Sequence, residues 1–168
     1  MEGIKHMDKV KPDKWGLENS IKKLQQQAES YAKEYEHTAE EFWNAHKQTI
    51  EGRDYLVLED YNGRKWKMDK SGFDIHTSNK KKKRAFRTKY LSKIFEVAQS
   101  PNEVWLGRTD ETLGNNIKKL DCYIFIKHYK NISIAVAGKI KGDKLIFSTW
   151  FPVRDKKVRE GLLIKTRQ

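Results

Sequence analysis

Closely spaced chain reversals in the second half of the sequence constrain its fold most strongly. Two of them, Tyr129-Lys130-Asn131 and Gly142-Asp143, separate runs that are rich in β-branched and aromatic residues. Strands joined by so few residues pair as antiparallel neighbours. The sequence therefore predicts an antiparallel meander of four to five strands. The predicted strands are residues 103–106, 121–128, 131–139, 144–151 and 162–165.

The residues before this meander predict a hairpin and a helix. Asn62-Gly63 lies between the runs 55–58 and 66–68, and this dipeptide is typical of a primed two-residue hairpin turn. Ser78 or Asn79 can cap a following helix, because their side-chain oxygens accept hydrogen bonds from free N–H groups of the first turn. The apolar face of that helix comprises Phe86, Tyr90, Ile94 and Val97.

Residues 17–50 contain neither glycine nor proline, and their apolar side chains recur every three to four positions. This pattern predicts one long helix of about 50 Å. Two arrangements are open: the helix lies against its own domain, or one end projects, docks on a partner or breaks near residues 43–46. The recurring residues are Leu17, Ile21, Leu24, Ala28, Tyr31, Tyr35 and Phe42.

Together these elements predict an α+β fold, with a long N-terminal helix and a β-hairpin, then a helix followed by a curved antiparallel sheet. Helices are expected on one face of that sheet. We expect residues 1–51 to form a flexible lead and the long amphipathic helix, and residues 52–168 to form the main domain.

The charge of the chain favours a polyanionic partner. Its 168 residues carry a formal net charge of +12, with 35 Lys and Arg against 23 Asp and Glu. Neutralising phosphates releases counterions, and this effect dominates non-specific binding to nucleic acids. Nucleic acid is the predicted partner, although lysines that only keep the surface soluble are the alternative.

Cysteine and hydropathy patterns exclude several classes. Cys122 is the only cysteine, so an internal disulfide is impossible, and no Cys and His residues have the spacing of a zinc site. The N-terminus lacks an apolar signal region, and no apolar run has the length of a membrane span. The sequence predicts a soluble chain without a membrane span, whose export would need a larger carrier.

One stretch is strongly basic. Between Asp74 and Glu96 there is no acidic residue, and His76 lies next to the run Lys80-Lys81-Lys82-Lys83-Arg84, with Arg87 beyond it. Cations just before a helix suit phosphate binding, whereas a solvated charge run is the ordinary alternative.

The residue types favour acid–base chemistry on a phosphodiester without a metal or another cofactor. A metal-dependent nuclease needs clustered carboxylates or histidines, and His76 is followed by no histidine until His128. RNA cleavage without metal needs a base for the 2′-hydroxyl, an acid for the leaving 5′-oxygen, and cations for the phosphorane. His76 suits either proton-transfer role because its ordinary pKa is near neutrality.

Side chains from several elements can supply the other roles. The candidate catalytic residues are His76, Arg87, Ser148, Thr149 and Arg159. The candidate substrate-binding residues are Lys80, Lys82, Lys83, Arg84, Trp105, Tyr123, Lys127 and Trp150. The alternatives are that His76 is a solvated loop residue, that the two tryptophans belong to the core, and that Arg159 only shapes a turn.

These residues occur in an order that resembles the PBECR domains, phage proteins grouped with barnase, EndoU, colicin and RelE-like nucleases. The order is Phe73-x-x-His76, a basic helix, Ser100-Pro101-Asn102-Glu103-Val104-Trp105, a meander, Phe147-Ser148-Thr149-Trp150-Phe151 and Arg159-x-Gly161-Leu162-Leu163. The similarity covers about residues 54–165. It implies a metal-independent RNase fold, common in phage proteins and toxins, and nominates His76, Ser148 or Thr149, and Arg159. The sequence departs from barnase because its central strands offer no obvious Glu general base.

The sequence and this resemblance lead to one principal hypothesis and two alternatives. The principal one is a toxin-type endoribonuclease that cuts RNA, with tRNA as a candidate, to 2′,3′-cyclic phosphate ends. It would act in the cytoplasm, and an acidic immunity protein would be its expected partner. The alternatives are a non-catalytic nucleic-acid-binding or phage structural module, and an ADP-ribosyltransferase toxin, which would depend on added NAD.

Overall fold

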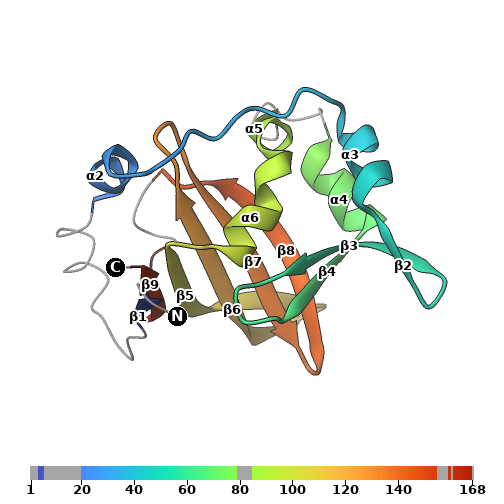
Figure 1. The fold of residues 1–168 in the computed structure, drawn as a ribbon. Coiled ribbons are helices and arrows are strands. Elements are labelled where there is room, and N and C mark those ends of the chain that lie inside the picture. The colour runs from blue at the N-terminus through green and yellow to red at the C-terminus, as the bar shows by residue number, and fades with distance from the viewer. Residues whose placement is uncertain (1–3, 6–19, 79–84, 155–158, 160, 168) are drawn as a thin grey trace.

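The computed structural model describes residues 4–5, 20–78, 85–154, 159 and 161–167. A large twisted sheet forms the body of the molecule, and α3, α4, α5 and α6 lie together on one of its faces (Figure 1). We call this face the helix face and the opposite one the site face. The helices are α2 (Ile21–Gln26), α3 (Ala39–His46), α4 (Lys70–Thr77), α5 (Ala85–Lys89) and α6 (Ile94–Gln99), with a 3-10 turn, η2, at Leu91–Lys93.

The sheet has nine strands within the described residues, in the order β1-β9-β5-β6-β7-β8-β4-β3-β2. All neighbours are antiparallel except β4 and β8, which are parallel and share one registered pair, Lys67 with Ile146. The strands are β1 (Ile4–Lys5), β2 (Gln48–Ile50), β3 (Arg53–Glu59), β4 (Lys65–Asp69), β5 (Glu103–Leu113), β6 (Asn116–His128), β7 (Ser133–Lys141), β8 (Lys144–Pro152) and β9 (Leu162–Arg167).

The α+β class and the antiparallel meander are confirmed, but the predicted count of four to five strands is wrong. β5 and β6 also extend well beyond the predicted limits, to a turn at Gly114. Residues 108–119 are too polar to predict a buried strand. They pair nevertheless, and opposite charges face one another across the two strands, Asp110 with Lys119 and Glu111 with Lys118.

The predicted long N-terminal helix is wrong. The structure has two short helices, α2 and α3, and residues 27–37 between them form no helix. Thr38 starts α3 through a capping box with Glu41, in which each side chain binds the other residue's backbone N–H. The segment before it is anchored instead by Asn131, whose side-chain amide exchanges two hydrogen bonds with the backbone of Ala32, at 2.8 and 2.9 Å.

The predicted hairpin is confirmed as β3 and β4, but its turn is not a primed two-residue turn. Residues 60–64 connect the strands, and only Gly63 has a positive φ among them. The buried carboxylate of Asp60 organises this loop. It accepts hydrogen bonds from the backbone N–H groups of Asn62 and Arg64 and from the Trp66 indole.

The predicted helix after the hairpin is divided. Residues 70–77 already form α4, for which Ser78 is the C-terminal cap and not the N-terminal cap of the next helix. Tyr90 then leaves the helical conformation between α5 and η2, with φ −117° and ψ 25°. Asn79 and the basic run 80–84 lie outside the described residues.

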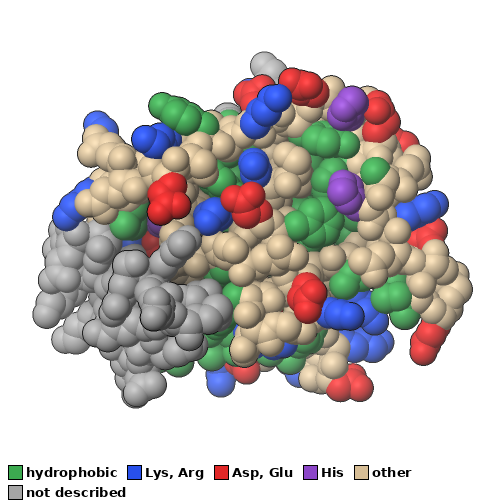
Figure 2. Space-filling view, in the orientation of Figure 1, with side chains coloured by type: hydrophobic (Ala, Val, Ile, Leu, Met, Phe, Trp, Pro, Cys, Tyr) green, Lys and Arg blue, Asp and Glu red, His purple; other side chains and the backbone are tan. Residues whose placement is uncertain are grey.

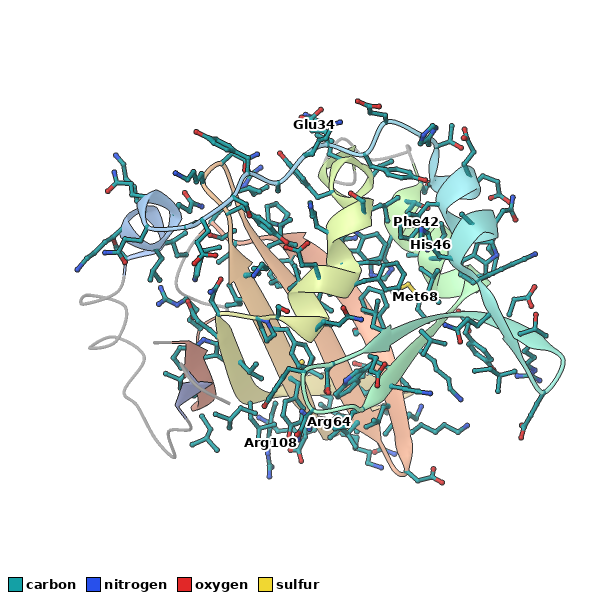
Figure 3. All side chains as sticks on the ribbon, in the orientation of Figure 1. Glu34, Phe42, His46, Arg64, Met68 and Arg108 are labelled. Carbon is teal, nitrogen blue, oxygen red and sulfur yellow. The ribbon has the colours of Figure 1, made fainter. Side chains whose placement is uncertain are left out.

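The main core lies between the helices and the helix face. Phe42 and Met68 point into it from α3 and β4, while Arg64 and Arg108 lie at the far end of the sheet (Figure 3). The Trp66 indole packs directly on Gly138, where a Cβ would lie 2.4 Å from a ring carbon. On the molecular surface that Figure 2 shows, acidic and basic side chains are interspersed. No helix in the described part of the chain is long and apolar enough to cross a membrane.

Candidate active site

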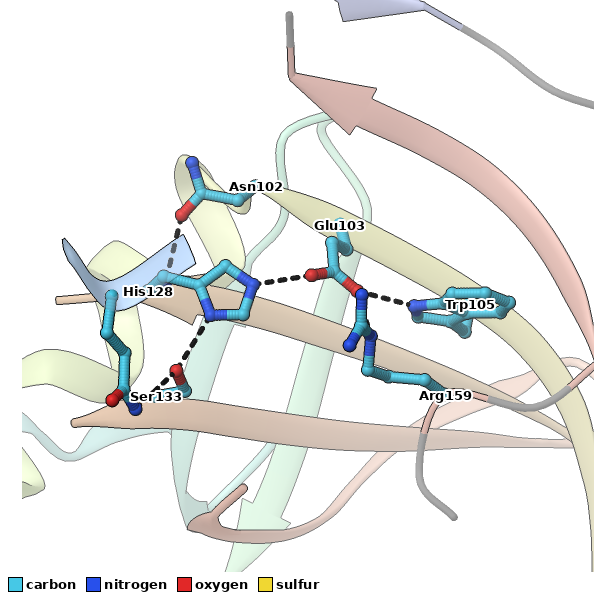
Figure 4. A network of polar contacts seen from close by, with 7 residues as sticks. Asn102, Glu103, Trp105, His128, Ser133 and Arg159 are labelled. Atoms are coloured by element: carbon cyan, nitrogen blue, oxygen red, sulfur yellow. Dashed lines mark hydrogen bonds and ion pairs between the residues drawn. The ribbon is translucent and has the colours of Figure 1, made fainter. Parts of the chain in front are cut away.

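The site face carries a second, smaller apolar cluster that borders a buried polar network. Alternation along β5 places Glu103 and Trp105 on this face and Val104 in the main core. The apolar cluster comprises Trp105, Ile126, Ala135, Val153 and Leu163. The network lies where β5 begins and β6 ends (Figure 4).

Glu103 is the centre of this network. Its Oε1 accepts hydrogen bonds from Arg159 Nε and from Trp105 Nε1, each at 2.9 Å. Its Oε2 lies 2.5 Å from His128 Nε2. An ionised carboxylate can only accept hydrogen bonds, so His128 carries its proton on Nε2 when Glu103 is charged.

His128 is fixed at its other nitrogen and at its backbone. Nδ1 lies 2.7 Å from the hydroxyl oxygen of Ser133, the first residue of β7. The backbone N–H of His128 donates to Oδ1 of Asn102, at 2.8 Å. The imidazole is therefore held between a carboxylate and a hydroxyl, in an orientation set by residues 102–103 and by the start of β7.

Arg159 reaches Glu103 from the segment before β9. Gly161, two residues later, has φ +96°, and a Cβ there would lie 2.3 Å from the Leu106 carbonyl oxygen. Only glycine permits this close approach to β5. Burial lowers the pKa of Arg159 from its usual value, and the neighbouring Glu103 carboxylate opposes that shift.

All three ionisable side chains are almost fully buried. The side chains of His128, Glu103 and Arg159 are 3%, 2% and 2% exposed. Charges are stable in such an environment only when they are paired and hydrogen-bonded. These three residues form a trio with complementary chemistry. The carboxylate can act as a base, the imidazole can act as an acid or a base, and the guanidinium can bind a phosphate.

A family model places the chain among nuclease-like proteins. The model of PBECR2, phage-Barnase-EndoU-ColicinE5/D-RelE like nuclease2, matches residues 41–165. The chain belongs to this family. No curated protein and no solved structure matched the chain. The resemblance inferred from the sequence is thus confirmed for PBECR2, and the match begins within α3 and includes the hairpin and the meander. The predicted division of the chain at residues 51 and 52 stays a prediction.

Two of the nominated residues of this PBECR2 chain meet in the network, and three lie across the sheet from it. Arg159 and Trp105 both contact Glu103. His76, Arg87 and Trp150 are on the helix face, where the His76 and Trp150 ring centroids are 5.6 Å apart and the Trp150 indole donates to the Arg87 carbonyl oxygen.

The other nominated residues are dispersed. Tyr123 packs against Trp66 on the helix face, and Lys127 donates to the Ser100 carbonyl oxygen. Thr149 is on the site face, in one row with Ala137, Ile124 and Trp105, three strand spacings or about 14 Å from Trp105. Ser148 lines a separate groove. Lys80, Lys82, Lys83 and Arg84 lie outside the described residues.

The prediction missed Glu103, His128 and Ser133. The sequence was expected to offer no obvious Glu general base on the central strands. The structure places Glu103 at the start of β5, where it faces His128, and the identity of the base stays a prediction. The sequence did contain a signal for this site: Glu103 and Trp105 alternate at the start of one predicted strand, and His128 ends the next one. Ends of this kind meet when the strands are antiparallel neighbours. Among the described residues, no three His, Cys, Asp or Glu side chains are grouped so that they could hold a metal ion.

Helix α2 packs beside this site. Ile21 and Leu24 pack against the smaller apolar cluster, and Gln25 Nε2 donates to Ser133 Oγ at 3.0 Å. The chain then crosses the β6–β7 turn, where Asn131 holds Ala32, and continues to α3 on the helix face. Residues 20–38 therefore connect the two faces around one end of the sheet.

The network predicts a large loss of stability when one charge is removed. Arg159→Met leaves the Glu103 carboxylate buried without its cation, so the free energy of unfolding should fall by about 3–5 kcal/mol. The double variant Glu103→Gln/Arg159→Met should lose less stability than the sum of the losses of the two single variants, by at least about 1 kcal/mol. Urea unfolding of the four chains measures both quantities.

Arg108→Met is the matched control. Arg108 is an exposed arginine whose Nε lies 3.7 Å from Asp121, so its loss should change stability by less than about 1 kcal/mol. Additive losses at Glu103 and Arg159 would contradict the proposed coupling.

Proposed function

We propose that this PBECR2 chain is a metal-independent endoribonuclease that cuts RNA, with tRNA as a candidate substrate, to 2′,3′-cyclic phosphate ends. The observation that carries the proposal is the direct contact of Glu103 with both His128 and Arg159. Membership in a nuclease-like family supports the reaction class. The nature of the RNA, the products and a toxin role go beyond that family assignment.

The trio can supply every proton transfer that the reaction needs. Glu103 removes the proton of the 2′-hydroxyl, whose oxygen then attacks the adjacent phosphorus. The bond from phosphorus to the 5′-oxygen breaks, and protonated His128 gives its proton to that leaving oxygen. Arg159 stabilises the negative charge that develops on the phosphorane. In this reaction the phosphate takes the place of the direct contact between Glu103 and His128.

This assignment moves the acid–base role away from His76. His76 Nδ1 is 2.7 Å from the Gly72 carbonyl oxygen within its own helix, and its ring lies beside Trp150 on the helix face. The imidazole of His128, in contrast, contacts a carboxylate that also binds a guanidinium. A catalytic role for His76 is the competing prediction.

Single substitutions discriminate between the two histidines. Glu103→Gln and His128→Gln should each lower the rate of RNA cleavage by about 10²–10⁴-fold, because each removes one proton-transfer group. His37→Gln, which changes an exposed imidazole on the segment before α3, is the matched control and should leave the rate within about twofold. Cleavage of a labelled RNA in EDTA measures the rates, and circular dichroism checks folding.

Loss of activity in His76→Gln combined with full activity in His128→Gln would contradict the assignment.

The reaction also requires the site to open, since Glu103, His128 and Arg159 are inaccessible in this structure. We place that opening at α2, which packs on the neighbouring apolar cluster and binds Ser133. Leu24→Asp places a charge against the apolar cluster and should weaken the closed form. Cleavage should then be faster by about tenfold, which corresponds to about 1.4 kcal/mol. The same RNA assay measures this change.

Gln26→Asp is the control for α2, because it adds the same charge at an exposed position of the same helix. If Leu24→Asp stays folded and cleaves no faster than Gln26→Asp, α2 does not limit access to the site.

A second candidate function is a non-catalytic nucleic-acid-binding or phage structural module. The burial of the whole trio favours it, because a buried ion pair also serves to hold elements together. RNA that stays intact with both the natural chain and Leu24→Asp would support this alternative. In a toxin role, the basic chain would require an acidic immunity protein as its neutralising partner.

A further inference from the structure

A groove lined by cations lies between β4 and β8, outside the candidate active site. Its volume is about 1080 Å³, and it extends over β2, β3, β4, β7 and β8. The single registered pair between β4 and β8 leaves the two strands apart on either side of it. The lining cations are Arg53, Lys65, Lys67, Lys139 and Lys144.

Strand alternation places these cations on the site face. Lys65 and Lys67 alternate with Trp66 and Met68, which are buried in the main core on the helix face. Lys139 follows Gly138, the residue on which Trp66 packs. The side chains of these lysines therefore project from the same side of the sheet as Glu103.

The groove cations form no close ion pairs with other described residues, although Lys65 is registered opposite Glu59. Together with the hydrogen bond from Lys141, the charge of Lys139 lowers the pKa of the Glu111 carboxyl. Within the described part of the chain, none of the five forms an ion pair at 4.0 Å or less, and only Lys67 has a ring contact, with Tyr55 at 5.7 Å. Three acidic residues also line the groove, Glu51, Asp69 and Asp143. Five cations against three carboxylates leave the groove with an excess of positive charge.

The sheet register gives the separation of the groove from the trio. Gly107, Cys122, Lys139, Ile146 and Lys67 form one row across five strands. This row lies four residues along β5 from Glu103, or about 13 Å. Lys139 and Lys67 are two and four strands from β5, so they are about 16 and 23 Å from Glu103.

We propose that this groove binds the phosphate backbone of single-stranded RNA several nucleotides from the cleaved bond. Cations that outnumber carboxylates on the face of the trio match a chain of phosphates, and the Tyr55 ring offers a surface on which a base can stack. The inference rests on the proposed function for the identity of the nucleic acid. It extends that function, because it assigns substrate binding to residues outside the reaction site.

Salt dependence of binding to an RNA that cannot be cut tests the groove. The probe is a fluorescent single strand of about 12 nucleotides with methylated 2′-hydroxyls, bound to the full chain. The variant Lys65→Gln/Lys67→Gln/Lys139→Gln should bind more weakly. The slope of log K against log salt should decrease in magnitude by about 2, since each single-strand phosphate contact contributes about 0.7.

The control Lys33→Gln/Lys47→Gln/Lys89→Gln removes the same charge from lysines that pair with Glu36, Asp54 and Glu34. Its slope should change by less than about 0.5. Equal slopes of log K against log salt for the two triple variants would overturn the proposal that the groove binds RNA, even if the natural chain cuts RNA. A slope that decreases only in the groove variant would support RNA binding in the groove, even if no RNA is cut. The two proposals can therefore fail independently.

Discussion

The buried carboxylate of Glu103 is the interaction on which the site depends. It accepts hydrogen bonds from side chains of β5 and of the segment before β9, and it contacts the histidine that ends β6. Each of these donors compensates part of the cost of taking a charge out of water. The same contacts bring together three groups that chemistry on a phosphodiester requires, so stability and proposed catalysis rest on one set of atoms.

The two faces of the sheet have different roles: one packs the main core, and the other carries the groups proposed to act on the substrate. The helix face carries the aromatic core, including Trp150 and the rings around Phe73, together with His76. The site face carries the trio, the smaller apolar cluster and the basic groove. Residues 20–38 connect the two, because α2 packs on the smaller apolar cluster while Thr38 starts the helix that covers the core.

The sequence predicted what depends on local signals. Short reversals at Asn131 and Gly142 defined the antiparallel meander, and Asn62-Gly63 marked the hairpin, although Asp60 and not a primed turn shapes its loop. The long helix failed because apolar spacing was continuous across Thr38, whose capping box with Glu41 starts a new helix. Periodicity alone does not reveal such a break.

The site was predicted only in part because its geometry depends on register between strands. Arg159 and Trp105 were nominated as a phosphate-binding and a base-stacking side chain, and the resemblance also nominated Arg159. Glu103 and His128, in contrast, are 25 positions apart in sequence and meet only when β5 and β6 pair. His76 was favoured by its basic sequence neighbours, yet the sheet separates it from Arg159. Most of that basic run lies outside the described residues.

Analysis of the RNA ends produced in EDTA tests the central claim most directly. The natural chain and Leu24→Asp are incubated with total RNA, and the new termini are identified by mass spectrometry. The account predicts 2′,3′-cyclic phosphates and 5′-hydroxyls with both chains, and neither terminus when Glu103→Gln is added to Leu24→Asp. New 5′-phosphate ends, or the same cyclic ends after Glu103→Gln, would contradict it.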